Sequence, residues 1–261
     1  MLPNVHILGK DIPTYGLLAG LGILLAVLYF KLEERREKVN LRESADTEMA
    51  FLWGLVGTFM GAKLLSLLTQ LPALAENWEK LFTHTDWFLQ TYLLSGFVFY
   101  GGFYGCLLGA YLYGKAARLS FSSLLKRLMP VVPLVHAFGR LGCFCTGCCY
   151  GIPSETLGLY FTASAIAPHH APLLPVQLYE AVLEGGLFVL LHGMRRRGKA
   201  GHALLGVYLF LYGISRFLLE FLRGDGYRGF IGPLSTSQII SIPTILWGLW
   251  LLLRLKKRKT A

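Results

Sequence analysis

The chain contains seven apolar segments of about 20 residues, and no other feature restricts its possible folds as strongly. A helix needs about 20 residues to cross the ~30 Å hydrocarbon core of a bilayer, so each segment is long enough to span a membrane. Only 15% of the residues are charged, against about 25% in soluble domains. We therefore predict an all-α integral membrane protein with seven transmembrane helices. The segments are roughly 12–30, 49–69, 95–113, 129–147, 174–193, 202–222 and 236–254.

Basic residues lie on alternate connections between these segments. The stretches 31–44, 114–127, 194–200 and 254–261 hold 18 of the 25 Lys and Arg residues. Because loops on the cytoplasmic side are enriched in Lys and Arg, this placement predicts an outside N-terminus and a cytoplasmic C-terminus. It also accounts for the net charge of +10 without any binding of nucleic acid. No linker or internal repeat divides the chain, so we expect a single transmembrane domain over 1–261.

Given this topology, five of the spans bring polar side chains to one layer in the outer half of the membrane. Charged groups at that depth are costly and usually mark a functional site. Arg216 and Glu220 are four residues apart and can pair on one helix face, which by itself would also fit a purely structural ion pair. The residues of this layer are Tyr15, Tyr100, Arg140, Gln177, Glu180, Arg216 and Glu220.

Arg140 favours a binding site over a structural ion pair. It has no acidic neighbour in sequence, and a segment with Gly142 and Gly151 follows it. Two arginines beside accessible backbone amides suit a phosphate, because the guanidinium fork matches phosphate oxygens. A phospholipid headgroup is the abundant phosphate of the outer leaflet. Gly101 and Gly102 beside Tyr100 would let a substrate approach the backbone, although close helix packing is the alternative for the glycines of this span.

Several motifs occur in an order and spacing that resemble the prolipoprotein diacylglyceryl transferase family. The likeness covers nearly the whole chain, and it rests on the order of the motifs and their shared depth. The motifs are Tyr15-Gly16, Tyr100-Gly101-Gly102, Gly139-Arg140-Leu141-Gly142 continuing to Gly147 and Gly151, Pro175-x-Gln177-Leu178-Tyr179-Glu180, and Arg216-x-x-x-Glu220-x-x-Arg223.

The resemblance implies a reaction and a location. Members of this family sit in the bacterial cytoplasmic (inner) membrane. They transfer the diacylglyceryl group of phosphatidylglycerol to the thiol of a lipobox cysteine in prolipoprotein signal peptides and release glycerol phosphate. By similarity, Arg140, Arg216 and Gly151 match functional positions, Glu220 would hold Arg216, and Tyr15 matches a tyrosine of the lipid pocket. We expect the arginines to stabilise the charge on the departing phosphate.

The chain departs from the family pattern at the proposed general base. Tyr100 replaces a histidine, and a tyrosine with a pKa of about 10 is a poor base at neutral pH. His136 lies one helical turn before Arg140, so it is a candidate substitute, and a bond to a neighbouring helix is the alternative role. The family also has asparagine, asparagine and glutamate where this chain has Cys143, Thr146 and Cys148.

Four of the five cysteines cluster at Cys143, Cys145, Cys148 and Cys149. Burial as small residues or a disulfide on the oxidising outer side is the favoured interpretation. A metal site or covalent catalysis is the less favoured one, because the usual paired C-x-x-C signature is absent. We therefore predict no metal and no cofactor.

The sequence leaves two alternatives to a transferase of this family. One is an enzyme that uses the same lipid donor with a different acceptor, which the altered signature would allow. The other is a non-catalytic membrane protein that binds or transports lipid. Transporters tend to show internal repeats and interrupted helices near the midplane of the membrane. The chain shows no repeat, and its polar groups gather toward one face, so transport is disfavoured.

Overall fold

The computed structural model describes residues 2–7, 9–94, 96–226 and 229–260. Both ends of the predicted 1–261 domain therefore lie outside the described residues. The chain is mainly helical and falls into two compact units, Met1–Val39 with Leu125–Ala261 (the first unit) and Asn40–Leu124 (the second unit).

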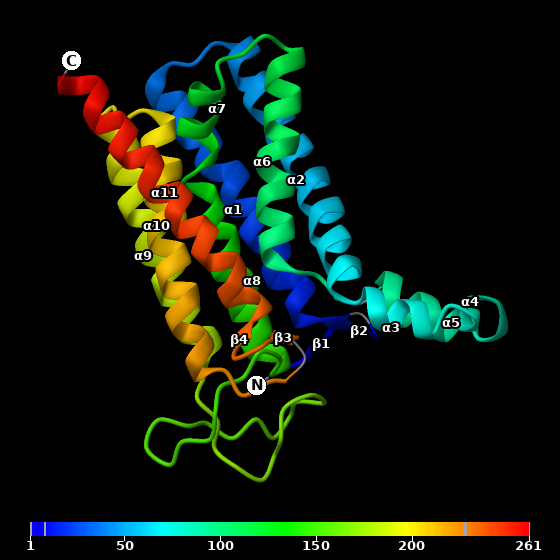
Figure 1. Ribbon diagram of the computed structural model, residues 1–261. Helices are drawn as coiled ribbons and strands as arrows, with labels where there is room; N and C mark the ends of the chain where they lie inside the picture. Colours follow the sequence, from blue (N-terminus) through cyan, green and yellow to red (C-terminus); the bar gives the residue numbers. More distant parts are fainter. Residues whose placement is uncertain (1, 8, 95, 227–228, 261) are drawn as a thin grey trace. The chain divides into compact units, whose positions relative to one another are not determined.

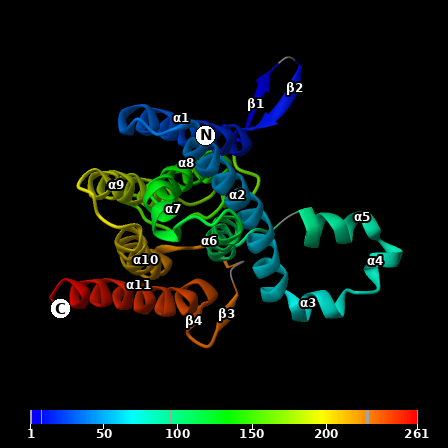
Figure 2. The same cartoon turned by 90° about the horizontal axis from the view of Figure 1, so that it is seen from above.

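The first unit is built from long helices that run alongside one another (Figures 1 and 2). Helix α8 packs against α1 and α9, and α10 packs against α9 and α11. Every one of these helices corresponds to a predicted apolar segment, and α7 (Phe121–Leu128) leads into α8. The helices are α1 (Thr14–Glu37), α8 (Val131–Thr146), α9 (Val176–Arg196), α10 (Gly201–Leu219) and α11 (Thr236–Thr260).

Short hairpins and one irregular segment complete the first unit. Strand β1 (Asn4–Ile7) pairs with β2 (Lys10–Pro13), and β3 (Phe230–Ile231) pairs with β4 (Leu234–Ser235), both antiparallel. The segment 147–175 between α8 and α9 is irregular, with isolated bridges such as Gly151 to Arg223, which follows the 3₁₀ turn η2 (Glu220–Leu222). This segment is held at the ends of α8, α9 and α10, near Arg140, Glu180, Arg216 and Glu220 of the predicted polar layer.

The second unit contains two long helices in close contact, α2 (Leu41–Thr69) and α6 (Phe99–Ala116). Asn40 caps α2 by accepting a hydrogen bond from the backbone N–H of Glu43 at 2.9 Å. A Cβ atom on Gly61 or Gly105 would overlap the backbone of the facing helix, so glycine permits this contact. The connection that follows α2 is largely helical as well. The connection forms α3 (Leu71–Glu76), α4 (Lys80–Thr83), α5 (Thr85–Phe88) and the π-helix η1 (Leu89–Leu94).

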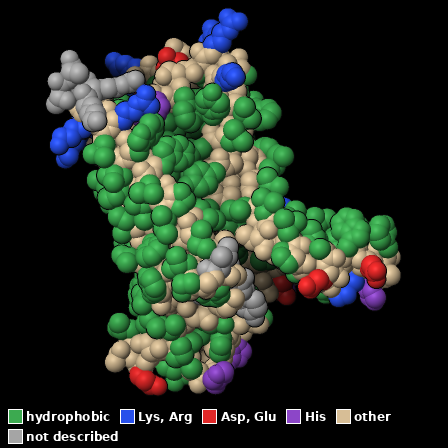
Figure 3. All heavy atoms as spheres, viewed as in Figure 1, with side chains coloured by type: hydrophobic (Ala, Val, Ile, Leu, Met, Phe, Trp, Pro, Cys, Tyr) green, Lys and Arg blue, Asp and Glu red, His purple; other side chains and the backbone are tan. Residues whose placement is uncertain are grey.

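Many helices have the length and surface of membrane spans. Within the described ranges, five helices are long and apolar enough to cross a bilayer: Thr14–Glu37, Leu41–Thr69, Phe121–Thr146, Gly201–Leu222 and Thr236–Lys256. Large apolar side chains such as Leu24, Val189 and Leu246 face outward from their helices, and Figure 3 shows hydrophobic side chains covering the flanks of the helices. The two remaining predicted spans are also helical, as α6 and α9.

Candidate active site

A buried carboxylate lies between two buried arginines where α8, α9 and α10 come together. Glu180, in the first turns of α9, places Oε1 2.9 Å from Nη2 of Arg140 on α8 and Oε2 4.0 Å from Nη1 of Arg216 on α10. Glu220 places Oε2 2.7 Å from the other terminal nitrogen of Arg216. All four side chains are buried. The structure therefore brings together the four charged residues that the sequence assigned to one layer.

Arg216 retains donor capacity that this network does not use. Its Nη2 also donates to Oγ of Ser237 on α11 at 3.2 Å. Its Nη1 is buried and has no hydrogen-bond partner among the described residues. An unpaired buried donor of a charged group costs free energy, so such an atom is suited to an acceptor that a ligand brings. Phosphate oxygens are acceptors of this kind.

His136 belongs to the same network. Its Nε2 accepts a hydrogen bond of 3.2 Å from Nε of Arg140, and its Nδ1 lies 3.0 Å from Oε1 of Glu184 on α9. The predicted proximity of His136 and Arg140 is confirmed, and the neighbouring-helix contact is present as well. Glu184 is only 1% exposed. The sequence reasoning missed it, although its spacing of four residues from Glu180 in an apolar span was a usable signal.

Tyr15 and Gly142 meet where α1 packs against α8. A Cβ atom on Gly142 would lie 2.9 Å from Cδ2 and 3.1 Å from Cα of Tyr15. Glycine at 142 therefore allows the first turn of α1 to approach α8 closely. Tyr15 is 46% exposed, so it lies at the rim of the buried network rather than inside it.

Gly151 stands where three segments of the first unit cross. Its N–H donates to the carbonyl of Leu174 at 2.9 Å, and a Cβ atom on Gly151 would lie 2.6 Å from Cβ of Leu174. A side chain at Gly224 would also clash, because its Cβ atom would lie 2.5 Å from the carbonyl oxygen of Gly151. This crossing holds Arg223 in place after α10. Arg223 donates to both carboxylate oxygens of Asp225, at 2.9 and 2.6 Å, a pair that was not assigned to the site from the sequence.

Gln177 ties the start of α9 to the segment after α8. Its Nε2 donates to the carbonyl of Cys148 at 2.6 Å, and the side chain is fully buried. Its Oε1 has no hydrogen-bond partner among the described residues. Gln177 thus fixes the backbone next to the arginine pair and leaves one acceptor unused.

Three of the clustered cysteines come together. The ligand atoms of Cys143, Cys148 and Cys149 all lie within 4.8 Å of one another, and the five cysteines of the chain carry no disulfide. Hydrogen bonds with the thiols of Cys143 and Cys148 hold the pKa of Cys149 well below its ordinary value, and Arg223 and Arg140 act in the same direction against burial. Cys145 lies in the same segment but outside this group.

Tyr100, Gly101 and Gly102 belong to the second unit, on the first turn of α6. Tyr100 is buried there and stacks on Tyr104, with 6.3 Å between the ring centroids. A Cβ atom on Gly101 would overlap the carbonyl of Gly61, and one on Gly102 would lie 3.2 Å from the Thr58 methyl group. Both glycines therefore serve the packing of α6 on α2. A role for these three residues toward a substrate stays a prediction.

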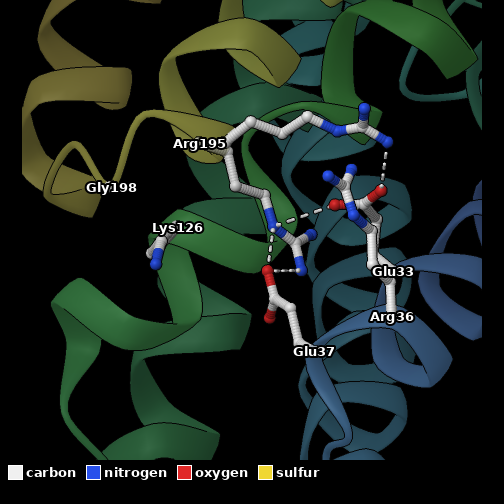
Figure 4. A pocket seen from close by; sticks show the side chains of 7 residues that line it. Glu33, Arg36, Glu37, Lys126, Arg195 and Gly198 are labelled. Atoms are coloured by element: carbon white, nitrogen blue, oxygen red, sulfur yellow. Dashed lines mark hydrogen bonds and ion pairs between the residues drawn. The ribbon is translucent and has the colours of Figure 1, made fainter.

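A separate pocket lies at the other end of α1 and α9 (Figure 4). Arg195 lies there with Nη2 3.1 Å from Glu37 and Nε 3.9 Å from Glu33, and Lys126 and Arg36 line the same pocket. Glu180 and Arg195 are fifteen residues apart on one helix, which corresponds to roughly 22 Å. This pocket lies in the basic connections that set the predicted topology, away from the arginine pair.

Comparison with known proteins identifies relatives over nearly the full length of the chain. A family model described as prolipoprotein diacylglyceryl transferase matches residues 4–254. The phosphatidylglycerol–prolipoprotein diacylglyceryl transferase of Clostridium tetani is 37% identical over 247 residues, which cover 94% of this chain and 94% of that protein. Transferase 2 of Clostridium perfringens is 32% identical over 97% of this chain and 96% of its own length. The enzyme of the same name from Idiomarina loihiensis is 30% identical, and the match covers 97% of this chain and 92% of that protein.

Proposed function

Because this chain belongs to the prolipoprotein diacylglyceryl transferase family, we propose that it transfers the diacylglyceryl group of phosphatidylglycerol to a cysteine thiol of a prolipoprotein. The names of its relatives specify both substrates. They favour this reaction over a different acceptor and over non-catalytic lipid binding or transport. The observation in the structure that carries the proposal is the buried pair of Arg140 and Arg216 on either side of Glu180.

The chain is a multi-pass membrane protein, as its apolar helices and its family indicate. We further propose that the chain forms one domain that crosses the bacterial cytoplasmic membrane seven times, with its N-terminus outside and its C-terminus in the cytoplasm. Two observations support it. All seven predicted spans are helical, and Lys and Arg dominate alternate connections. In this topology the arginine pair lies in the outer half of the membrane.

The arginines act on the phosphate of the lipid. A thiolate attacks the glycerol carbon that carries the phosphate ester, the C–O bond breaks, and its electron pair stays on the departing glycerol phosphate. Arg140 and Arg216 face this growing negative charge from two helices. Because the groups are buried and already oriented, they stabilise the charge with little reorganisation. Nη1 of Arg216 lies 4.0 Å from Glu180 and makes no hydrogen bond among the described residues, so it is the donor available to a phosphate oxygen.

Glu180 and Glu220 orient the arginines. Each guanidinium has five N–H donors in a rigid fork, which is more than these contacts use, so donors remain for the substrate. The two carboxylates also balance the two positive charges before the anionic lipid arrives, which makes the empty site tolerable in a membrane. We assign Tyr15, Gln177, Gly142 and Gly151 to the lipid site, and we place the signal peptide with its lipobox cysteine at the half-exposed side chain of Tyr15.

His136 holds Arg140 in place in this proposal. Both of its ring nitrogens lie against other groups, Nε2 toward Arg140 and Nδ1 toward Glu184. These two contacts fit a positioning role for His136. The base role predicted for His136 from the sequence is tested by substitution.

The transfer itself is tested with purified full-length protein in detergent. The protein is incubated with phosphatidylglycerol and a synthetic lipobox peptide, and the peptide mass is measured. We expect the mass of the diacylglyceryl thioether and an equal amount of free glycerol phosphate. Phosphatidylethanolamine in place of phosphatidylglycerol tests the donor, and a peptide with serine in place of its cysteine tests the acceptor atom. Product from the serine peptide, or no product from the cysteine peptide, would refute the proposed reaction.

A further inference from the structure

The three-thiol group of Cys143, Cys148 and Cys149 has the dimensions of a metal site. All three sulfur atoms lie within 4.8 Å of one another. Bonds of about 2.3 Å from each sulfur to a tetrahedral Zn²⁺ would separate the sulfurs by roughly 3.8 Å, which this group reaches without large movement. A disulfide would join only two of the sulfurs and leave the third thiol unpaired.

The backbone around this group is bent and firmly held. Gly147 ends α8 with φ of 75°, and Cys149 adopts φ of 61°, a left-handed conformation that costs free energy for a residue with a side chain. The bend is fixed by Gln177, which donates to the carbonyl of Cys148 at 2.6 Å, and by Ser164, which donates to the carbonyl of Thr146 at 2.9 Å. A strained loop that presents two thiols to a third is typical of a preorganised ligand site.

Neighbouring polar groups suit bound thiolates. Oγ1 of Thr146 lies 3.4 Å from Sγ of Cys148. Arg140 stands one helical turn before Cys143 on α8, so its charge lies on the same side of the helix as the first thiol. Three thiolates with one divalent cation carry a net negative charge, which a nearby guanidinium offsets. Groups around a metal site that orient and neutralise its ligands contribute strongly to metal affinity.

We propose that Cys143, Cys148 and Cys149 bind a thiophilic divalent cation such as Zn²⁺, and that its fourth position takes the thiol of the acceptor peptide. Among the described residues, no further His, Cys, Asp or Glu joins the group, so one tetrahedral position is left for a ligand. Three protein ligands with an open position are the arrangement of catalytic rather than structural zinc. The inference rests on the proposed transfer to a thiol, and it revises the sequence-based expectation of no metal.

The site would supply the nucleophile that the reaction needs. When the acceptor thiol binds the cation, the S–H proton leaves to solvent, because a coordinated thiol is deprotonated. The sulfur then forms a bond to the glycerol carbon of phosphatidylglycerol as the C–O bond to phosphate breaks. The products are the thioether, glycerol phosphate and the released proton.

The first test measures metal binding directly. Full-length protein purified in detergent is dialysed against Zn²⁺, and bound metal is counted by mass spectrometry. We expect about one Zn²⁺ per chain, and affinity at least about tenfold weaker in Cys143→Ser and in Cys148→Ser. Cys145→Ser is the matched control, since Cys145 lies in the same segment outside the group, and it should bind like the wild type. Folding of each variant is checked by size-exclusion chromatography.

The second test uses Co²⁺ in place of Zn²⁺ to report on the ligands. The wild type should show thiolate-to-cobalt charge-transfer absorption, which should strengthen when the lipobox peptide is added and stay unchanged with the serine peptide. Three results would overturn the proposal. The wild type could bind no stoichiometric metal, the variant with all three cysteines changed to serine could retain the metal, or peptide masses could reveal a disulfide within the group. An unchanged cobalt spectrum with the cysteine peptide would overturn the role of the fourth position.

The two proposals fail in different ways. If the thioether product forms equally well in protein freed of metal by a chelator, the transferase assignment stands and the metal site is refuted as a participant. If metal binds as expected and no thioether forms from phosphatidylglycerol, the transfer reaction fails while the metal site remains. Loss of product on chelation, restored by Zn²⁺, would support both.

Discussion

At the scale of single residues, the site is a network of buried charged side chains, and only some of them could be predicted from the sequence. Arg140, Glu180, Arg216 and Glu220 were predictable, because charged residues in apolar spans are rare and the topology assigns them one depth. Glu184 and the Arg223–Asp225 pair were not assigned to the site. The contact of Glu184 with His136 depends on how α9 faces α8. Sequence patterns do not specify that rotation.

The two candidate bases are distinguished by substitution. His136→Ala removes the acceptor for Nε of Arg140 as well as a ring nitrogen, so we expect it to lower turnover more than Tyr100→Phe does. General base assistance is worth about 10²–10⁴-fold. Glutamine in His136→Gln offers Arg140 a hydrogen-bond acceptor but is not a base. If His136→Gln is more active than His136→Ala and its pH profile is unchanged, the role of His136 is to position Arg140. An inactive Tyr100→Phe beside a fully active His136→Ala would contradict this assignment.

Glu180 should matter for stability as well as for activity. Glu180→Gln removes the negative charge between two buried arginines and leaves Arg140 without its carboxylate partner. Loss of one member of a buried ion pair costs about 3–5 kcal/mol, so the midpoint of thermal unfolding in detergent should fall clearly. Glu37→Gln is the control, because the side chain of Glu37 is 37% exposed and its partner Arg195 keeps a second carboxylate, Glu33, so the shift should be clearly smaller. Equal shifts in both variants would argue against the central position of Glu180.

At the scale of elements, all seven predicted spans are helices, and the errors lie at their ends. Helix α1 continues to Glu37 and α2 begins at Leu41, inside a stretch predicted to be a connection. Lys, Glu and Arg are good helix formers, so helices extend beyond their apolar part. The course of the segment 147–175 was not predictable, because it is fixed by isolated contacts such as that of Gly151 with Leu174.

The contact of α1 with α8 is tested at two glycines of one helix. A methyl group at Gly142 would lie 3.1 Å from the backbone of Tyr15, whereas one at Gly139 has no atom within 4 Å. Gly142→Ala should therefore destabilise the protein by about 1–3 kcal/mol through overpacking. Gly139→Ala should be neutral or stabilise it by up to about 1 kcal/mol, since alanine favours helix. Unfolding midpoints in detergent measure both, and a Gly142→Ala variant as stable as wild type would show that α1 does not pack this tightly.

At the scale of the whole molecule, the composition and the alternating charge of the connections predicted a membrane protein and its orientation. Apolar helices confirm the membrane character. How the two units fit together was not predictable from sequence, because it depends on contacts between helices that lie far apart in the chain.

Topology is tested with reporters at the ends of the chain. We expect a reporter that works only in the cytoplasm to be active when it is fused after Ala261, and one that works only outside the cytoplasm to be inactive there. The reason is that the C-terminal stretch 254–261 is rich in Lys and Arg. Fusion within the connection 70–92, which has a single basic residue, should give the opposite result and serves as the control. A C-terminal reporter active only outside the cell would reverse the orientation and move the arginine pair to the cytoplasmic half.

The central claim is that Arg140 and Arg216 recognise the lipid phosphate through their planar forks, and the most direct measurement is turnover of arginine-to-lysine variants. Lysine keeps the charge but loses bidentate geometry. Arg140→Lys and Arg216→Lys should each lower kcat by about 10²–10³-fold in protein that still folds. Arg195→Lys, a buried arginine in the distant pocket, should stay near wild type. Full activity in Arg140→Lys, or equal losses in all three variants, would contradict the claim.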